Sequence, residues 1–236
     1  MTSAKTGEKR RADVLCIGAG PANLSVGALL RENSQLSCEV LEQRADVSWH
    51  PGLLWTSSRL QGNPLSDLVT PVSPTSDLSF LCFLKERGRL SRHIVSSRWN
   101  GVSRAEFNDY LTWAARRLNV RTGQEVVAVS ATGNAFAVTT GTGDVWEARD
   151  LVLGVGAEPH LPAFAAGLSP ERVWHAGSHT HATTSLEGKR VAVVGGGQSA
   201  GELVLRLLST PGERPAHLVW ITGQDGIRPM DTSPFS

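Results

Sequence analysis

The sequence predicts an α/β fold built from two strand, turn, helix, strand units. Two observations carry this prediction: a short apolar run enters a glycine-rich turn and a helical segment at Gly18, and the same order recurs at Gly195. A further strand follows each helix. The chain has 236 residues, 40% of them hydrophobic and 19% charged, which suits a globular protein with one large or two small domains.

The first unit follows a polar leader at residues 1–11. Residues 13–17 form a short apolar run of the kind that a buried parallel strand gives. Pro21 opens a helix to about Arg31, because a missing N–H is harmless in the first helical turn. Residues 38–42 then predict a second strand, which ends in an acid, Glu42.

The middle of the chain predicts a long irregular segment, two helices and a β-meander. Residues 49–79 are rich in Pro, Gly, Ser and Thr, and long loops of this kind are usually functional. Residues 80–87 predict one helix, and a capping box at 103–106 opens the next. Residues 126–156 alternate apolar and polar side chains between glycine turns, as antiparallel strands do.

The second unit comprises a strand at 190–194, a turn at 195–200, a helix to about Leu208 and a strand at 217–222. We expect residues 12–160 to form a first nucleotide-binding domain and residues 161–236 the start of a second. A doubly wound domain needs more strands than the chain supplies before Ser236. The expected fold is therefore incomplete at the C-terminus.

Composition excludes several classes of protein. The 23 Lys+Arg and 22 Asp+Glu give a net charge of +1 without a basic block, which argues against nucleic-acid binding. No run approaches the roughly 20 apolar residues of a membrane span, and the N-terminus lacks a signal-peptide core. We expect a cytoplasmic protein. Cys16, Cys38 and Cys82 are too few for a disulfide framework, and none is within reach of another by sequence.

The two glycine turns indicate dinucleotide sites. A Gly-x-Gly turn lets the backbone approach a pyrophosphate, which the following helix N-terminus stabilises. The first turn carries Asn23 where a third small residue is usual, and Glu42 is placed to hold a ribose hydroxyl. The second turn has neither an acid nor an arginine directly after its closing strand. The absence of the acid slightly favours NADP over NAD. Arg228 is the nearest candidate for a 2′-phosphate, and equally a solvated loop residue.

Two dinucleotide sites in one chain indicate a flavoprotein, with FAD at the first site and a nicotinamide cofactor at the second. Disulfide reductases of this architecture need a redox-active cysteine pair, which the sequence does not show. Oxidases and monooxygenases remain.

Six motifs together resemble the lysine and ornithine N-hydroxylases of siderophore biosynthesis, in register from Asp13 to Ser236. They are Gly18-Ala-Gly-Pro-Ala-Asn-Leu24, Trp49-His-Pro-Gly52, Leu68-Val-Thr70 followed by Pro74-Thr-Ser76 and Phe80-Leu81, Ser103-Arg-x-Glu-Phe-x-Asp-Tyr-Leu-x-Trp-Ala114, Gly195-Gly-Gly-Gln-Ser-Ala200 and Asp231-Thr-Ser-Pro-Phe235. The spacing over residues 91–115 is slightly nearer to the bacterial L-lysine N6-monooxygenases.

The resemblance implies a two-dinucleotide-binding flavoprotein, with a Rossmann-like FAD domain and an inserted NAD(P) domain. It implies that FAD is reduced by NADPH, captures O₂ as a flavin C4a-hydroperoxide and passes oxygen to the terminal amine of lysine, ornithine or a related amine. No acid-base catalytic residue is required. The implied cofactor residues are Gly18, Gly20, Pro21 and Asn23 at the FAD pyrophosphate, Glu42 at its ribose, Trp49, His50 and Gln61 along the flavin, Val126 near the adenine, and Gly195, Gly196, Gly197, Gln198 and Ser199 at the nicotinamide nucleotide.

Three departures from the family pattern leave alternatives open. Ser66 stands where the family has a lysine that contacts the substrate carboxylate, so the substrate need not be held by a carboxylate. Gly223 replaces the arginine that receives the 2′-phosphate. The family continues past the Ser-Pro-Phe motif, so the chain could be a non-catalytic remnant, or could pair with a second chain or a copy of itself.

The histidines allow two interpretations other than flavin binding. His175, His179 and His181 with Glu187 are spaced like metal ligands, but no carboxylate or cysteine completes a geometry, so we predict no metal. His50 could also be a structural histidine, but its position between Trp49 and Pro51 favours a place along the flavin.

Overall fold

The computed structural model describes residues 8–55, 57–60, 62–96, 102–165, 167–178 and 185–223. As far as it describes them, the residues fall into two compact units. The first comprises Met1–Trp49, Asn63–Val102 and Glu106–Ala157, and the second His50–Gly62, Ser103–Ala105 and Glu158–Ser236. Both units are built from segments that are far apart in the sequence.

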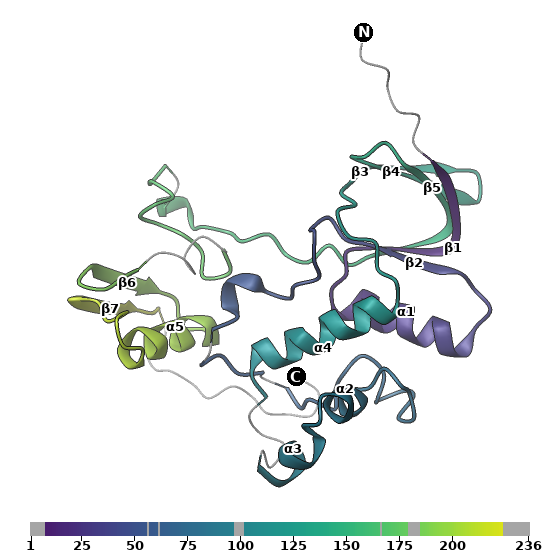
Figure 1. The fold of residues 1–236 in the computed structure, drawn as a ribbon. Helices are drawn as coiled ribbons and strands as arrows, with labels where there is room; N and C mark the ends of the chain where they lie inside the picture. The colour runs from purple at the N-terminus through teal and green to yellow at the C-terminus, as the bar shows by residue number, and fades with distance from the viewer. Residues whose placement is uncertain are drawn as a thin grey trace. The chain divides into compact units, whose positions relative to one another are not determined.

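The first unit contains a mixed five-stranded sheet in the order β2-β1-β5-β4-β3 (Figure 1). Strand β1 (Lys9–Ile17) lies parallel to both β2 (Cys38–Leu41) and β5 (Val145–Leu153). Strands β3 (Val126–Thr132) and β4 (Ala135–Thr140) continue the sheet antiparallel to each other and to β5. The parallel pair and the meander were both expected from the sequence.

Strand β1 begins at Lys9, earlier than the predicted start at Asp13, and includes the last residues assigned to the leader. Its basic start pairs with the start of β5, where Lys9 lies opposite Val145. The Lys9 Nζ lies 3.0 Å from a Glu147 carboxylate oxygen, and Arg11 lies 3.5 Å from the other. Lys9 and Arg11 lower the pKa of the Glu147 carboxyl. This pairing is between distant segments, so local polarity could not predict it.

Helix α1 (Pro21–Asn33) packs against β1 and β2, with Leu24 and Ala28 fully buried. Helix α4 (Arg104–Arg117) contributes the buried Tyr110 and Leu111. The hydroxyl of Tyr110 donates to the Leu78 carbonyl at 2.8 Å, and burial raises its pKa, so it remains a neutral donor.

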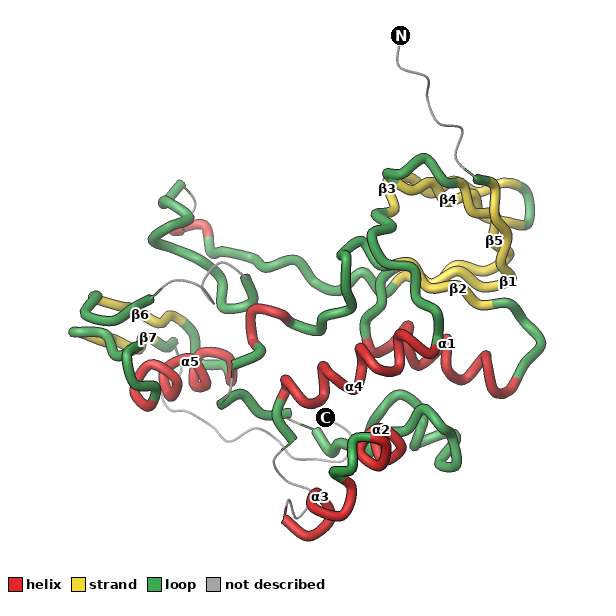
Figure 2. Tube along the Cα trace, in the orientation of Figure 1, coloured by secondary structure: helices red, strands yellow, loops and turns green. Residues whose placement is uncertain are grey.

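Three helices follow the irregular segment, although two were predicted (Figure 2). Helix α2 (Phe80–Glu86) begins where expected, with its N-cap Ser79 accepting from the Cys82 N–H at 3.2 Å. Helix α3 (Leu90–Ser96) was missed from the sequence. In the described part of the chain, no helix is both long and apolar enough to span a bilayer.

The second unit contains a two-stranded parallel sheet of β6 (Arg190–Val194) and β7 (His217–Ile221), joined by α5 (Gln198–Ser209). These three elements were predicted. Its core joins Leu203 and Leu207 on α5 to Val193 and to Leu53 and Trp55 of the distant segment 50–62. A short 3₁₀ turn, η1 (Pro51–Leu53), opens that segment, and a second, η2 (Ala163–Ala165), lies further along the chain.

Candidate nucleotide-binding sites

The first glycine turn is closed by contacts that leave no room for a side chain. Gly18 has φ +91°, and a Cβ there would lie 2.4 Å from the Gly154 carbonyl oxygen. A Cβ on Gly154 would in turn lie 2.4 Å from the Asn23 amide nitrogen. The end of β5 therefore sits directly against the turn, and both positions require glycine.

Asn23 braces this turn from inside. Its side chain is 1% exposed, and its amide donates to the carbonyl oxygens of Ile17 at 2.9 Å and Gly18 at 2.8 Å. Both N–H bonds of the amide are used, so the side chain does not extend to a pyrophosphate. Any contribution of Asn23 to phosphate binding comes through the backbone and through the shape of the turn.

The start of α1 is open to an anion. Gly20 is the N-cap and Pro21 occupies the first turn. A Cβ on Gly20 would have the Gly154 oxygen as its nearest neighbour, at an ordinary contact distance of 3.9 Å, so a ligand can approach the backbone. Free N–H groups and the positive end of the helix dipole favour a phosphate at this position.

Glu42 connects the end of β2 to the turn. Its carboxylate is 9% exposed and accepts the N–H of Ala19 at 2.9 Å and that of Arg44 at 3.0 Å. An ionised carboxylate has about four lone-pair positions, so Glu42 can still accept ribose hydroxyls. The carbonyl of Glu42 accepts the Gln124 N–H at 2.8 Å, which places the start of β3, at Val126, near this acid.

The predicted flavin residues are divided between the units. Trp49 belongs to the first, where its N–H donates to Asn108 at 2.6 Å and its ring meets Phe107 edge-on at 5.6 Å. His50 belongs to the second and adopts a left-handed φ of +47° as the N-cap of η1. Gln61 lies outside the described residues.

Gly52 completes the Trp-His-Pro-Gly motif for a steric reason. A Cβ on Gly52 would lie 2.7 Å from the Gly177 carbonyl oxygen and 2.8 Å from that of Ser178. His175 accepts the N–H of Gly177 at 3.0 Å on its Nδ1. The absence of a side chain at Gly52 therefore lets its backbone pack against that of Gly177 and Ser178, and His175 stabilises the turn at Gly177.

Ser66 lies exposed on a turn of the first unit, and its N–H donates to the Asn63 carbonyl at 2.9 Å. The following Asp67 is fixed, because its carboxylate accepts the N–H groups of Thr70 at 2.7 Å and Phe80 at 2.6 Å. Position 66 is therefore a neutral side chain on a well-anchored loop.

The second glycine turn is held by backbone and indole contacts. Gly195 has φ +128°, donates its N–H to the Ile221 carbonyl at 2.8 Å and accepts the Trp220 indole N–H at 2.7 Å. Gly197 is the N-cap of α5, and among the described residues nothing lies within 4 Å of a Cβ built there. This end of α5 can also receive a phosphate.

A charged cluster beside this turn was missed from the sequence. Gln198 donates its side-chain N–H to the Glu202 Oε1 at 3.0 Å, and the Arg104 guanidinium lies 3.3 Å from the Glu202 Oε2. The side chains of Arg104 and Glu202 are only 7% and 13% exposed. The sequence indicates Arg104 only as part of a capping motif, and no local pattern links positions 104 and 202.

Two cysteines that are distant in sequence lie on adjacent strands. Cys16 on β1 and Cys38 on the adjacent β2 lie on paired strands, although no cysteine is near another in sequence. The Cys38 thiol and burial raise the pKa of Cys16, and both thiols are free. Within the described ranges no group of three or more His, Cys, Asp or Glu side chains is arranged to hold a metal ion. His179 and His181 lie outside those ranges.

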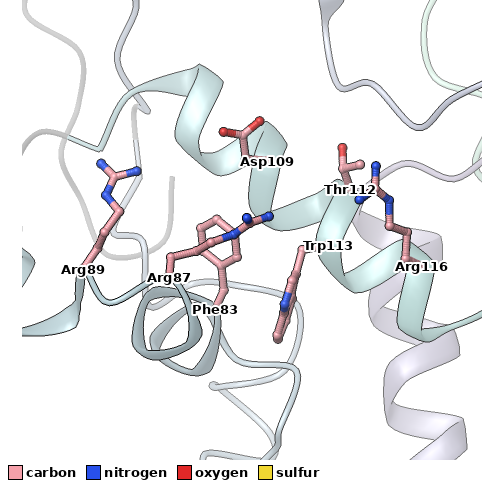
Figure 3. A pocket seen from close by; sticks show the side chains of 7 residues that line it. All are labelled: Phe83, Arg87, Arg89, Asp109, Thr112, Trp113 and Arg116. Atoms are coloured by element: carbon pink, nitrogen blue, oxygen red, sulfur yellow. The ribbon is translucent and has the colours of Figure 1, made fainter.

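Two surface pockets of the first unit are separate from the predicted sites. One, of about 340 Å³, lies between the end of α2 and α4, where Figure 3 shows Arg87 extending toward Asp109. The other, of about 350 Å³, lies along the middle of β1, around Asp13. No residue predicted to bind cofactor or substrate lines either pocket.

Comparison with known proteins extends over nearly the whole chain. The family model for L-lysine 6-monooxygenase/L-ornithine 5-monooxygenase matches residues 10–236. L-lysine N6-monooxygenase of Escherichia coli is 33% identical over 231 residues, which cover 97% of this chain and 54% of that protein. Putrescine N-hydroxylase of Shewanella oneidensis is 36% identical over 228 residues, covering 93% of this chain and 45% of that one.

Solved structures confirm the predicted fold class. The ornithine N-hydroxylase KtzI of Kutzneria sp. 744, with reduced FAD, NADP⁺ and L-ornithine, superposes with a TM-score of 0.84 at 36% identity, over 95% of this chain and 56% of that one. DfoA, the FAD-bound cadaverine monooxygenase of Erwinia amylovora, gives 0.83 at 32% identity, over 93% and 53%. The chain spans about half the length of these relatives.

Proposed function

Because the chain belongs to the L-lysine 6-monooxygenase/L-ornithine 5-monooxygenase family, we propose that it holds FAD at the first glycine turn and NADPH at the second. The proposed reaction is the NADPH- and O₂-dependent N-hydroxylation of a terminal primary amine for siderophore biosynthesis. When bound, the flavin supplies the redox chemistry, transferring one oxygen atom of O₂ to the amine while the other leaves as water.

The single observation that supports FAD binding most strongly is the bond between Glu42 and Ala19. It places a buried carboxylate 2.9 Å from a backbone nitrogen of the glycine turn. One carboxylate at the end of β2 can therefore accept ribose hydroxyls while the start of α1 binds the pyrophosphate. The remaining residues of this chain orient the cofactor and exclude water, and we assign no side chain as a general acid or base.

Flavin retention tests this assignment. A hydrogen bond to a charged group contributes about 1.5–3 kcal/mol, so Glu42→Ala should weaken FAD binding by roughly tenfold to hundredfold. Glu39→Ala is the matched control, since Glu39 lies on β2, which ends directly before Glu42, and pairs with Arg121 at 2.7 Å. FAD affinity would be measured by fluorescence quenching. Equal affinities for the two variants would contradict the assignment of Glu42.

A diamine is a second candidate substrate, and the neutral Ser66 favours it. Putrescine and cadaverine, the substrates named for two relatives, carry no carboxylate, so a diamine would not need a lysine at this position. Hydroxylamine formation would be assayed with lysine, ornithine, putrescine and cadaverine. Ser66→Lys should shift relative turnover toward the amino acids by about twofold to fivefold, because a lysine at this exposed position could pair with their carboxylate.

The same assay tests catalysis itself. Flavin reduction by NADPH with hydroxylamine production would establish a working N-hydroxylase, and parallel reactions with NADH would measure the cofactor preference that Gly223 leaves open. A purified chain that binds no flavin and consumes no NADPH would favour the alternative, a remnant or one part of a split enzyme. Adding a relative's C-terminal half as a separate chain would then distinguish these two outcomes.

A further inference from the structure

The Gln198, Glu202 and Arg104 side chains form one connected cluster at the start of α5. Gln198 is the first residue of the helix after its N-cap Gly197, and Glu202 lies one turn further, on the same face. Glu202 accepts from the Gln198 amide at 3.0 Å and pairs with Arg104 at 3.3 Å. The backbone carbonyl of Arg59 holds Arg104 in turn, accepting from its Nε at 3.2 Å.

The chemistry of this cluster determines which end of the Gln198 amide faces Glu202. An ionised carboxylate can only accept hydrogen bonds, and that of Glu202 lies against the Arg104 guanidinium. The amide nitrogen of Gln198 must therefore point to Glu202, which leaves its oxygen to face away from the carboxylate. An isolated glutamine could rotate and present either group.

We propose that Glu202 is a positioning residue that fixes Gln198 as a hydrogen-bond acceptor for the nicotinamide nucleotide. This inference rests on the proposed NADPH site. The matching group on the ligand is then a donor, which a carboxamide N–H or a ribose hydroxyl can supply. A ligand group that can only accept hydrogen bonds would face the acceptor oxygen of Gln198 and could not pair with it, so such a ligand would be rejected.

Arg104 has a second role in this arrangement. Glu202 lies in the second turn of the helix whose N-terminus would receive a pyrophosphate, and an unpaired carboxylate there would repel the anion. The buried guanidinium neutralises that charge. Glu202 can therefore orient Gln198 without weakening the attraction of the helix end for phosphate.

Glu202→Gln tests the orientation. A glutamine at 202 can offer its oxygen to Arg104 and its N–H to Gln198, so the Gln198 amide should reverse and present a donor outward. We expect the NADP⁺ dissociation constant to rise about tenfold, as for the loss of one good hydrogen bond. FAD affinity should not change. Glu213→Gln is the control, because Glu213, which follows α5, forms a comparable pair with Arg206 of α5 at 2.6 Å.

The double variant separates orientation from charge. Arg104→Gln alone should weaken NADP⁺ binding, because it leaves the Glu202 carboxylate uncompensated. Combining it with Glu202→Gln removes that charge, so NADP⁺ should bind the double variant more tightly than Arg104→Gln. Additive losses in the double variant would overturn the charge argument.

A measurement without nucleotide keeps the inference independent of the proposed function. The side-chain amide ¹⁵N–¹H signals of Gln198, assigned by their disappearance in Gln198→Ala, should move in Glu202→Gln and stay in Glu213→Gln. If they move while the wild-type chain binds no NADP⁺, the NADPH assignment fails and the orienting role of Glu202 stands. If they do not move, or if Glu202→Gln binds NADP⁺ as tightly as wild type, the inference is overturned.

Discussion

Replacing Asn23 should destabilise the first unit, mainly because the Gly18 carbonyl oxygen would lose its hydrogen-bond donor. In Asn23→Ala the Ile17 oxygen keeps a partner, because it also accepts the Gly154 N–H at 2.9 Å. The Gly18 oxygen loses its bond from Asn23 at 2.8 Å. Leaving that acceptor unpaired costs about 1–3 kcal/mol, and losing the bond to Ile17 adds about 0.5–1.5 kcal/mol, so we expect about 1.5–4.5 kcal/mol in total.

The assay is urea unfolding followed by far-ultraviolet circular dichroism, with FAD affinity measured in parallel. Asn33→Ala is the control on the same helix, since its amide donates to the Leu29 carbonyl at 3.0 Å from an exposed position. Its stability should stay within about 0.5 kcal/mol of wild type. FAD binding should weaken in Asn23→Ala, because the turn loses its internal support.

Asn23→Asp tests the loss of the two N–H donors at nearly constant side-chain volume. A carboxylate at 23 would face the oxygens of Ile17 and Gly18 and could not donate, so this variant should be less stable than Asn23→Ala at neutral pH. Repulsion and burial would raise the carboxyl's folded-state pKa above its unfolded value, so stability should fall as pH rises between the two. Unfolding midpoints for Asn23→Ala and Asn33→Ala that coincide would refute the bracing role.

Two further predictions concern backbone packing and pH. Gly52→Ala should destabilise the second unit by about 1–3 kcal/mol, because its Cβ would lie 2.7 Å from the Gly177 oxygen, whereas Gly62→Ala, with no neighbour within 4 Å in the described structure, should unfold like wild type. The Ser37 hydroxyl and N–H lower the pKa of Asp13, so their contribution is present above the unfolded pKa near 4 and is lost as pH falls through the folded pKa. Ser37→Ala should therefore lose less stability on acidification than wild type, as measured by urea unfolding at several pH values.

Local patterns predicted the parts of the fold that local physics decides. Both glycine turns, with the helices that begin at Pro21 and Gln198, were placed correctly, because apolar runs, glycines and helix starts are adjacent in the chain. Strand β1 was predicted too short, because its basic start is stabilised by pairing with residues far along the sequence.

The sequence did not predict the contacts that hold the side chains around the candidate sites. Asn23 is an expected pyrophosphate residue, and the motif does not show that its amide donates to the Ile17 and Gly18 carbonyls. Arg104 and Glu202 carried no signal, because a buried ion pair between distant positions has no spacing rule. For Arg104 and Glu202 the missing information was a contact between residues far apart in sequence.

The two turns differ in how they are supported, and this difference bears on how each nucleotide would be held. At the first turn, the supports are side chains buried on the protein side: the Asn23 amide under the loop and the Glu42 carboxylate against Ala19. These supports are in place before a ligand arrives, so little ordering is needed on binding.

At the second turn, the support is an indole N–H to Gly195 and a half-buried glutamine whose direction depends on an ion pair. The N-cap Gly197 is exposed, and no described atom would lie within 4 Å of a Cβ there. A site of this kind can admit and release its ligand without disturbing a core. We therefore expect a retained FAD and an exchanging NADPH, with FAD dissociating at least about tenfold more slowly than NADP⁺ from the same chain. Stopped-flow displacement of each nucleotide would measure both rates, and equal rates would show that the buried supports of the first turn do not govern retention.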